Sequence, residues 1–245
     1  MSPQRTGRRR SHRREDQGPI VLEGVETLTY DLTPTEVLTE QDIQTIHNAS
    51  MRLLSETGML LIDHVPALEN LKANGAKVDG EIVKIDEDTL MNFVNLAPNT
   101  FTQLARDDRN HVPVGGNRII FAPVYGPAFV HDFDQGRRPS TLEDFHNFAK
   151  LVYMTPELHH AGGVLVEPND VDVDERHLDM LMAHMTLSNK AFMGNVIHPD
   201  NARDTVTMSE IIFGKEEIRE NPASLSIVSI SSPMRMDERM LSVLE

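Results

Sequence analysis

The 245-residue chain has 39% hydrophobic residues, enough for a substantial folded core, and a formal net charge of -15. The negative charge argues against general attraction to nucleic acid or to anionic lipid. The sequence contains no cysteine, which excludes a disulfide framework and thiolate metal sites, and no apolar segment long enough to cross a bilayer. We therefore expect a cytoplasmic globular protein that binds neither membranes nor nucleic acid.

The first 24 residues differ from the rest in composition. They show almost no apolar periodicity and contain a run of arginines, namely Arg8, Arg9, Arg10, Arg13 and Arg14. Burial could not offset the entropy lost on ordering such a segment, so the sequence predicts a disordered basic arm over residues 1–24. We interpret this arm as a solvated tail; an acidic partner or RNA is the alternative reading of the arginines.

Residues 25–111 are predicted to form an N-terminal α/β extension. Apolar residues at helical spacing follow Thr39, which is a candidate N-cap with Asp42 in a capping-box position, and Gly58 is a natural end for that helix. The next segment predicts a short helix, a turn at Asn74–Gly75, a short strand over residues 82–85 and a second helix that ends before Pro98.

From residue 112 onward the pattern changes to strands and then to alternating strands and helices. Apolar runs within residues 112–134, interrupted by glycines, predict a hairpin or two consecutive strands, and Ser140 or Thr141 is expected to cap the helix that follows. Three further strands, beginning near Leu158, Lys190 and Ala223, recur about every 30 to 35 residues with a helix after each. This spacing is typical of βα units in a parallel sheet.

An eight-stranded α/β barrel needs about 250 residues for the barrel alone. Residues 112–245 therefore predict the first part of a (β/α)8 TIM-type barrel that is incomplete in this chain. An open three-layer α/β domain is the alternative. Half a barrel would leave its mouth open to water, so we expect the chain alone to be inactive.

Functional side chains in parallel α/β proteins lie at the carboxyl ends of strands, where the loops converge. The residues at these positions that we expect to bind a substrate are Tyr125, Glu167, Asn195 and His198; Phe129, near the same mouth, is a candidate through the resemblance described below. No catalytic residue is assigned.

Each of these positions also has a structural interpretation. Glu167 is either an ordinary polar exit from a strand or a half-buried carboxylate that needs a partner. The segment that follows His198 favours helix capping by Asp200 or Asn201. Gly162–Gly163 inside a strand indicates close approach by a ligand or another backbone, or a packing kink.

Metal and nucleotide sites find little support. The histidines show no H-E-x-x-H pattern, and no G-x-G-x-x-G occurs. Asp170, Asp172 and Asp174 resemble the start of a calcium loop, but Glu175 stands where that loop needs glycine, so we interpret them as an acidic cluster at a helix N-terminus. We predict no metal site; a metal-assisted hydrolase or lyase is kept as a rival on the strength of the histidines alone.

Several segments in order resemble the trimethylamine methyltransferase family, over residues from about Leu32 to Glu245. They include LTEQDIQTIHNASMRLLSETGMLL, NGAKVDGEIVKIDEDTLMNFVNLAPNTFTQLARD, FAPVYGPAFVHDFDQGRRPSTLEDFHNFAKL and GGVLVEPNDV. The resemblance implies a (β/α)8 barrel with an N-terminal extension. It also implies transfer of a methyl group from trimethylamine, or from a quaternary amine such as glycine betaine, to the cobalt of a corrinoid protein.

The resemblance further implies that this chain binds no cofactor directly, because the methylcobamide belongs to the cognate corrinoid protein. Tyr125 and Phe129 would offer ring faces to the cationic substrate, and Glu167 would supply the counter-charge. Outer helices could form a homo-oligomer. A non-catalytic remnant that binds quaternary amines is the non-enzymatic rival.

Overall fold

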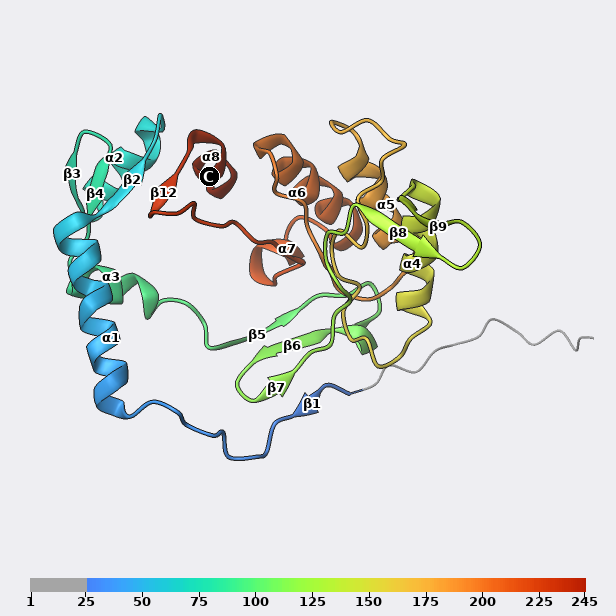
Figure 1. Cartoon of the computed structure of the whole chain (residues 1–245), viewed down its shortest axis with the longest axis horizontal. Coiled ribbons are helices and arrows are strands. Elements are labelled where there is room, and N and C mark those ends of the chain that lie inside the picture. Colours follow the sequence, from blue (N-terminus) through green and yellow to red (C-terminus); the bar gives the residue numbers. More distant parts are fainter. Residues whose placement is uncertain (1–25) are drawn as a thin grey trace, which may run out of the picture.

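The computed structural model describes residues 26–245, a mixed α/β protein with eight α-helices and several small sheets in this part of the chain (Figure 1). The predicted basic arm lies outside the described residues. Figure 1 shows two groups of elements. We call α1 to α3 with their sheet the N-terminal lobe, and the group around α4 to α7 the main lobe.

The N-terminal lobe begins with α1 (Glu40–Arg52), which continues as a π-helical turn (Leu53–Thr57). The predicted capping box is confirmed: the Thr39 backbone N–H donates to Asp42, and the Asp42 N–H donates to the Thr39 hydroxyl. Gly58 ends the helix with φ of 83°. A side chain at that position would place Cβ 2.5 Å from the Val83 carbonyl oxygen, so glycine is required there by sterics as well as by conformation.

A four-stranded sheet forms the centre of this lobe. The elements that follow the π-helical turn in the chain are β2 (Met59–Leu61), α2 (Val65–Ala73), β3 (Lys77–Asp79), β4 (Ile82–Lys84) and α3 (Glu87–Val94). The strand order is β12-β2-β4-β3, in which β12 (Arg235–Met236) comes from near the end of the chain. The two predicted short helices and the strand at residues 82–85 are therefore confirmed.

The last elements of the chain return to the N-terminal lobe. β12 (Arg235–Met236) pairs in parallel with β2, and α8 (Glu238–Leu244) follows it. Met236 and Leu241 are buried together with Leu61 and Val83 in one apolar cluster. Residues from the end of the chain therefore share the core of the N-terminal lobe. The domain boundary at residue 112 stays a prediction.

The first part of the main lobe is antiparallel. Three two-stranded sheets pair β5 with β6, β1 with β7, and β8 with β9. Their bounds are β1 (Leu28–Thr29), β5 (Thr100–Gln103), a 3-10 turn (Asp108–Asn110), β6 (Val112–Gly115), β7 (Arg118–Ile119), β8 (Phe129–Asp132) and β9 (Gly136–Pro139). The hairpin that forms, β8–β9, lies partly outside the predicted region of residues 112–134, because its second strand begins only at Gly136.

Four segments then lie side by side in parallel order. Backbone N–H groups of His160 and Gly126 bind the carbonyls of Phe121 and Val164, which aligns residues 121–127 with residues 159–167. A parallel bridge joins His160 to Ala191, just before β10 (Phe192–Met193), and β10 pairs in parallel with β11 (Ser224–Leu225). The predicted succession of parallel strands is supported. The described residues contain no closed barrel.

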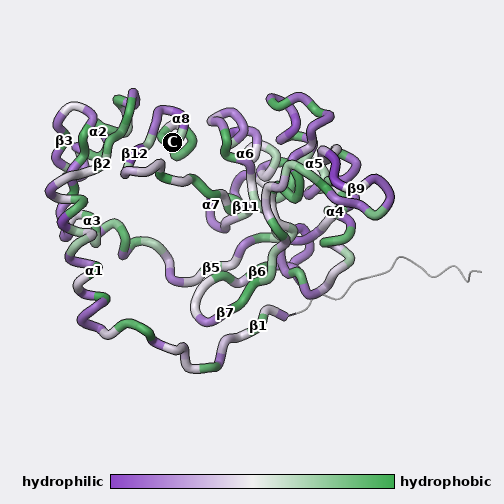
Figure 2. The backbone as a smooth tube through the Cα atoms, viewed as in Figure 1, coloured by the Kyte–Doolittle hydropathy of each residue, from purple (hydrophilic) through white to green (hydrophobic). Residues whose placement is uncertain are grey.

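Helices connect these segments, as the alternating pattern predicts. They are α4 (Leu142–Tyr153), α5 (Arg176–Leu187), α6 (Pro199–Phe213) and the short α7 (Glu217–Glu220). Figure 2 shows hydrophobic and hydrophilic residues interleaved along the helices. Phe145 of α4 and Met180 of α5 are buried against Val164 and Val166, so the first two helices pack on the second parallel segment.

Candidate functional site

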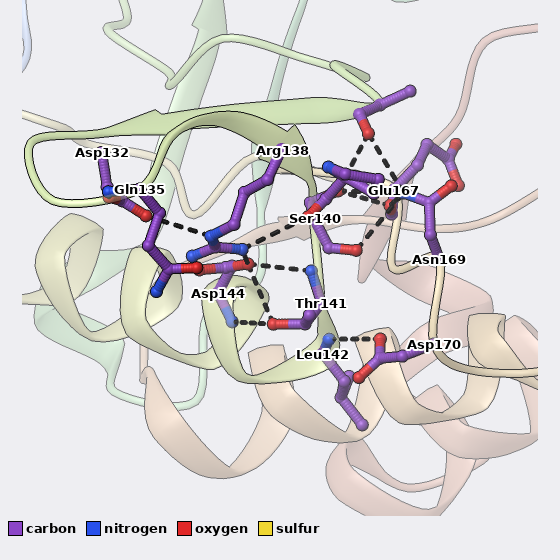
Figure 3. Close-up of polar contacts among 12 residues, drawn as sticks. Asp132, Gln135, Arg138, Ser140, Thr141, Leu142, Asp144, Glu167, Asn169 and Asp170 are labelled. Carbon is purple, nitrogen blue, oxygen red and sulfur yellow. Dashed lines mark hydrogen bonds and ion pairs between the residues drawn. The ribbon is translucent and has the colours of Figure 1, made fainter.

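The candidate site lies where residues 121–127 and 159–167 end. The Glu167 N–H donates to the Pro127 carbonyl at 2.9 Å, and the Asn169 N–H donates to the Ser140 carbonyl at 2.9 Å. The Ser140 hydroxyl donates to the Glu167 carbonyl at 2.6 Å (Figure 3). These bonds bring the loops that follow two neighbouring parallel segments into contact, at the edge where functional side chains are expected.

Arg138 fixes the β8–β9 hairpin to the start of α4. Its Nε donates to Asp132 at 3.0 Å, and its two terminal nitrogens donate to the two oxygens of Asp144 at 2.6 and 2.8 Å (Figure 3). This two-pronged bond holds the pKa of Asp144 well below its ordinary value. Asp144 also completes a capping box with Thr141, which is the N-cap of α4; of the two predicted caps, Thr141 is confirmed.

Glu167 has the charge partner that its position requires. Arg176, the first residue of α5, lies 3.3 Å from Glu167 Oε2, and about a fifth of each side chain is exposed. Oε2 is buried and accepts no hydrogen bond. Oε2 is nevertheless the oxygen that faces Arg176, so this ion pair balances the charge of the carboxylate.

Tyr125 lies within the electrostatic reach of Glu167. Burial raises the pKa of the Tyr125 hydroxyl, and the negative charge of Glu167 raises it further. Just over half of Tyr125 is exposed, at 53%. Of the five predicted residues, these two lie on neighbouring segments, which the bond from the Glu167 N–H to the Pro127 carbonyl joins.

Glycine makes room for the Tyr125 ring. A Cβ on Gly163 would lie 2.6 Å from Tyr125 Cε2 and 3.0 Å from the Cβ of Met193. Gly162 has φ of 80°, and a Cβ added there would lie 2.6 Å from Pro123 Cγ. The atoms closest to Gly162–Gly163 thus belong to packed side chains, among them the ring of a candidate site residue, and not to the ligand or second backbone of the first interpretation.

Phe129 has a cationic neighbour within the protein. It lies on β8, and the Arg137 guanidinium is 3.6 Å from the centre of its ring. A cation of the protein itself therefore covers one face of this ring. The role of Phe129 in substrate binding stays a prediction, with one face left for it.

Asn195 and His198 organise the connection between β10 and α6. Asn195 is buried, and its side-chain oxygen accepts bonds from the Ile197 N–H and the Asn201 amide. His198 is the N-cap of α6, and its Nδ1 accepts the N–H of Asp200 at 3.4 Å. The capping residue is thus His198 itself, rather than the Asp200 or Asn201 that the sequence favours. Binding of substrate by either residue is an untested prediction.

The acidic run after Glu167 is also used differently from what we predict. Its first member, Asp170, accepts the Leu142 N–H at 2.8 Å and so stabilises the start of α4 rather than that of α5. Asp172 accepts the Asp174 N–H at 3.0 Å within the loop. Among residues 26–245, no group of three or more metal-binding side chains comes together, and no helix is long and apolar enough to cross a membrane.

Comparison with known proteins identifies the family. The model of the family "Trimethylamine methyltransferase (MTTB)" matches residues 5–245. The chain belongs to this family. The resemblance found in the sequence is therefore confirmed.

Curated relatives within the trimethylamine methyltransferase family are longer than this chain. A glycine betaine methyltransferase of Desulfitobacterium hafniense (strain Y51) is 38% identical over 209 residues, which are 85% of this chain and 43% of that protein. A proline betaine:corrinoid methyltransferase of Eubacterium limosum is 30% identical over 167 residues, 66% of this chain and 34% of that protein. Trimethylamine methyltransferase MttB of D. hafniense (strain DSM 10664 / DCB-2) is 24% identical over 80% of this chain and 40% of its own length.

The structure of this family member also shows buried polar groups that sequence reasoning missed. Gln103 is fully buried and donates to the carbonyls of Phe192 and Ala223, at 2.8 and 3.3 Å. Its side-chain oxygen lies 3.1 Å from His160 Nε2, and His160 Nδ1 accepts the Gly162 N–H, so Nε2 carries the proton. One side chain from the predicted extension thus joins three parallel segments of the main lobe, and no local sequence signal marks it.

Lys190 is the second such group. Its ammonium donates to three carbonyls, those of Val152, Thr155 and Leu158, at 2.7 to 2.8 Å. Burial lowers the pKa of Lys190 to about 8, while Glu157 opposes this shift. The lysine satisfies carbonyls at and beyond the C-terminus of α4, a position where a cation also interacts favourably with the helix dipole.

Proposed function

We propose that this chain forms part of a methyltransferase that removes a methyl group from a quaternary amine, such as glycine betaine, and passes it to a corrinoid protein. Family membership carries the proposal, and the name of the 38% identical relative favours glycine betaine as the substrate class. The site that we propose in this chain contains Tyr125 and Glu167, which lie on segments joined by the bond from the Glu167 N–H to the Pro127 carbonyl.

A quaternary ammonium group has no N–H to donate, so a protein recognises it through ring faces and negative charge. Tyr125 offers a half-exposed ring, and Glu167, whose N–H binds the Pro127 carbonyl, brings a carboxylate to the same edge. The amine left after methyl loss is neutral, so no proton has to be moved. The residues of this chain would therefore act by binding the cation and holding one methyl group in line for transfer.

A corrinoid carried by the partner protein would supply the nucleophile that accepts the methyl group. The half exposure of Tyr125 fits this arrangement, because a methyl group held on its ring remains accessible to a second protein. We further propose that the four parallel segments are the beginning of a (β/α)8 barrel, and that residues 25–111 are its N-terminal extension.

The test uses the purified protein in its natural length, with reduced free cobalamin or the corrinoid protein as acceptor. Demethylation of glycine betaine, proline betaine and trimethylamine is followed by the absorbance of the methylated corrinoid and by mass spectrometry of the amine. Replacing Tyr125→Leu removes the ring and should raise KM for the amine about tenfold, while Tyr125→Phe keeps the face and should stay within about twofold of the wild type.

If none of these amines methylates the corrinoid acceptor, the proposal is refuted. Binding of glycine betaine without any methyl transfer would support the non-catalytic alternative. If the protein instead hydrolyses one of these amines, and only with an added metal ion, the metal-assisted hydrolase or lyase is supported. If transfer occurs but Tyr125→Leu leaves KM unchanged, the site is elsewhere.

A further inference from the structure

Phe133 lies at the tip of the β8–β9 hairpin and is fully exposed, with a relative accessibility of 103%. Single exposed apolar residues are common and by themselves need no explanation. Phe133 differs from them because the backbone that presents it is fixed. A fixed, fully solvated aromatic ring contributes little to folding and is the type of side chain that anchors protein interfaces.

The tip is held by the residue before the phenylalanine. Asp132 Oδ1 accepts the backbone N–H groups of Asp134 and Gln135, at 3.0 and 2.6 Å. Its other oxygen accepts the Arg138 Nε, and Arg138 is bound in turn to Asp144 on α4 (Figure 3). A continuous set of charged hydrogen bonds therefore links the turn to a helix of the main lobe, and little entropy would be lost when the ring is bound.

The hairpin stands at the same edge as the candidate site. It follows the carboxyl end of residues 121–127, where Tyr125 lies, and its last residues lead to Ser140, which binds the Glu167 carbonyl. A second protein that approaches Tyr125 to receive a methyl group has to come to this edge. Phe133, in the turn of this hairpin, is fully exposed to solvent.

We propose that Phe133 is an anchor for the corrinoid-carrying partner, inserting its ring into an apolar pocket on that protein. This inference rests on the proposed methyl transfer. The charged neighbours Asp134 and Arg137 would lie at the rim of the interface, where they affect orientation and salt dependence more than affinity.

The test compares two acceptors with the natural-length protein. With the corrinoid protein, Phe133→Ala should raise KM for that protein at least about tenfold and leave KM for the amine unchanged. With free reduced cobalamin, which needs no docking, the variant should match the wild type. Phe133→Trp should restore most of the affinity, and Ile211→Ala, at an exposed apolar position on α6, is the matched control.

The outcomes separate the two proposals. A wild-type protein that methylates neither acceptor refutes the proposed function. Normal wild-type transfer with an unchanged KM in Phe133→Ala overturns the docking role, as does an equal loss with free cobalamin, which would place Phe133 in the reaction site. Loss of self-association in Phe133→Ala, measured by sedimentation, together with an unchanged KM, would show that a second copy of the chain is the occupant. Unfolding midpoints of the variants verify that each is folded.

Discussion

Two buried histidines show how single residues set the response of the fold to pH. Burial lowers the pKa of both His160 and His184 to about 4 from an ordinary 6.5. Both rings use Nε2 as the hydrogen-bond donor, to Gln103 and to the Gly163 carbonyl. They are therefore neutral in the folded protein, and the neutral form is what the surrounding contacts require.

Stability should fall as the pH decreases through the range between these two values. Below about pH 6.5 these histidines are protonated in the unfolded chain, whereas in the folded protein they stay neutral down to about pH 4. The free energy of unfolding therefore decreases by up to about 1.4 kcal/mol per pH unit for each histidine. Urea unfolding at pH 7, 6 and 5 measures this slope. His160→Gln should reduce the part of the slope that the two histidines supply by about half, and an unchanged slope would show that His160 is not responsible.

Residue roles were predictable where the signal is local. Thr39, Gly58 and Thr141 act on backbone groups within a few positions, so their identity and spacing predicted their roles. Glu167 could be expected to need a partner, but Arg176 could not be named, because the loop between them adopts no regular structure that spacing alone reveals. The role of Gln103 could not be predicted, because the carbonyls that it binds lie about 90 and 120 positions away in the sequence.

At the scale of elements, α4 is stabilised at both ends by residues from other parts of the chain. Asp170 accepts an N–H at its start, and Lys190 donates to the Val152 carbonyl near its end. Periodicity and capping predicted where α4 lies. They could not predict these two contributions, because each comes from a later loop.

Replacing Lys190→Met should destabilise the protein by about 2 to 4 kcal/mol, since the carbonyls of Val152, Thr155 and Leu158 would lose a buried donor. Denaturant unfolding at pH 7 measures the difference. Lys150→Met, at an exposed position on the same helix, should change stability by less than about 0.5 kcal/mol. Equal effects of the two substitutions would contradict the structural role given to the buried ammonium.

At the scale of the whole molecule, the alternation of strands and helices after residue 158 predicted the parallel order that the structure shows. The return of the chain to the N-terminal lobe was not predictable. The segment that contains Met236 is too short to show a strand pattern, and only the free edge of β2 determines where it pairs. Patterns identify elements, whereas partners depend on surfaces that form only in three dimensions.

Leu241 tests whether this return is part of the stable fold. It is buried against the core of the N-terminal lobe, so Leu241→Ala should cost about 2 to 4 kcal/mol, whereas Leu244→Ala, at an exposed position on the same helix, should cost little. Amide hydrogen exchange should become faster at Leu61 and Val83 in the first variant alone. Unchanged protection at these amides would show that the lobe is stable without α8.

The pairing of β12 with β2 has a consequence for the order of events during synthesis. At about 5 to 20 residues per second, the ribosome needs on the order of ten seconds or more to progress from Leu61 to its partner Met236. During that interval β2 presents an unpaired edge, and the apolar residues that Leu241 later covers stay exposed. The nascent N-terminal lobe is therefore a natural client for chaperones that shield apolar surface until the late strand arrives.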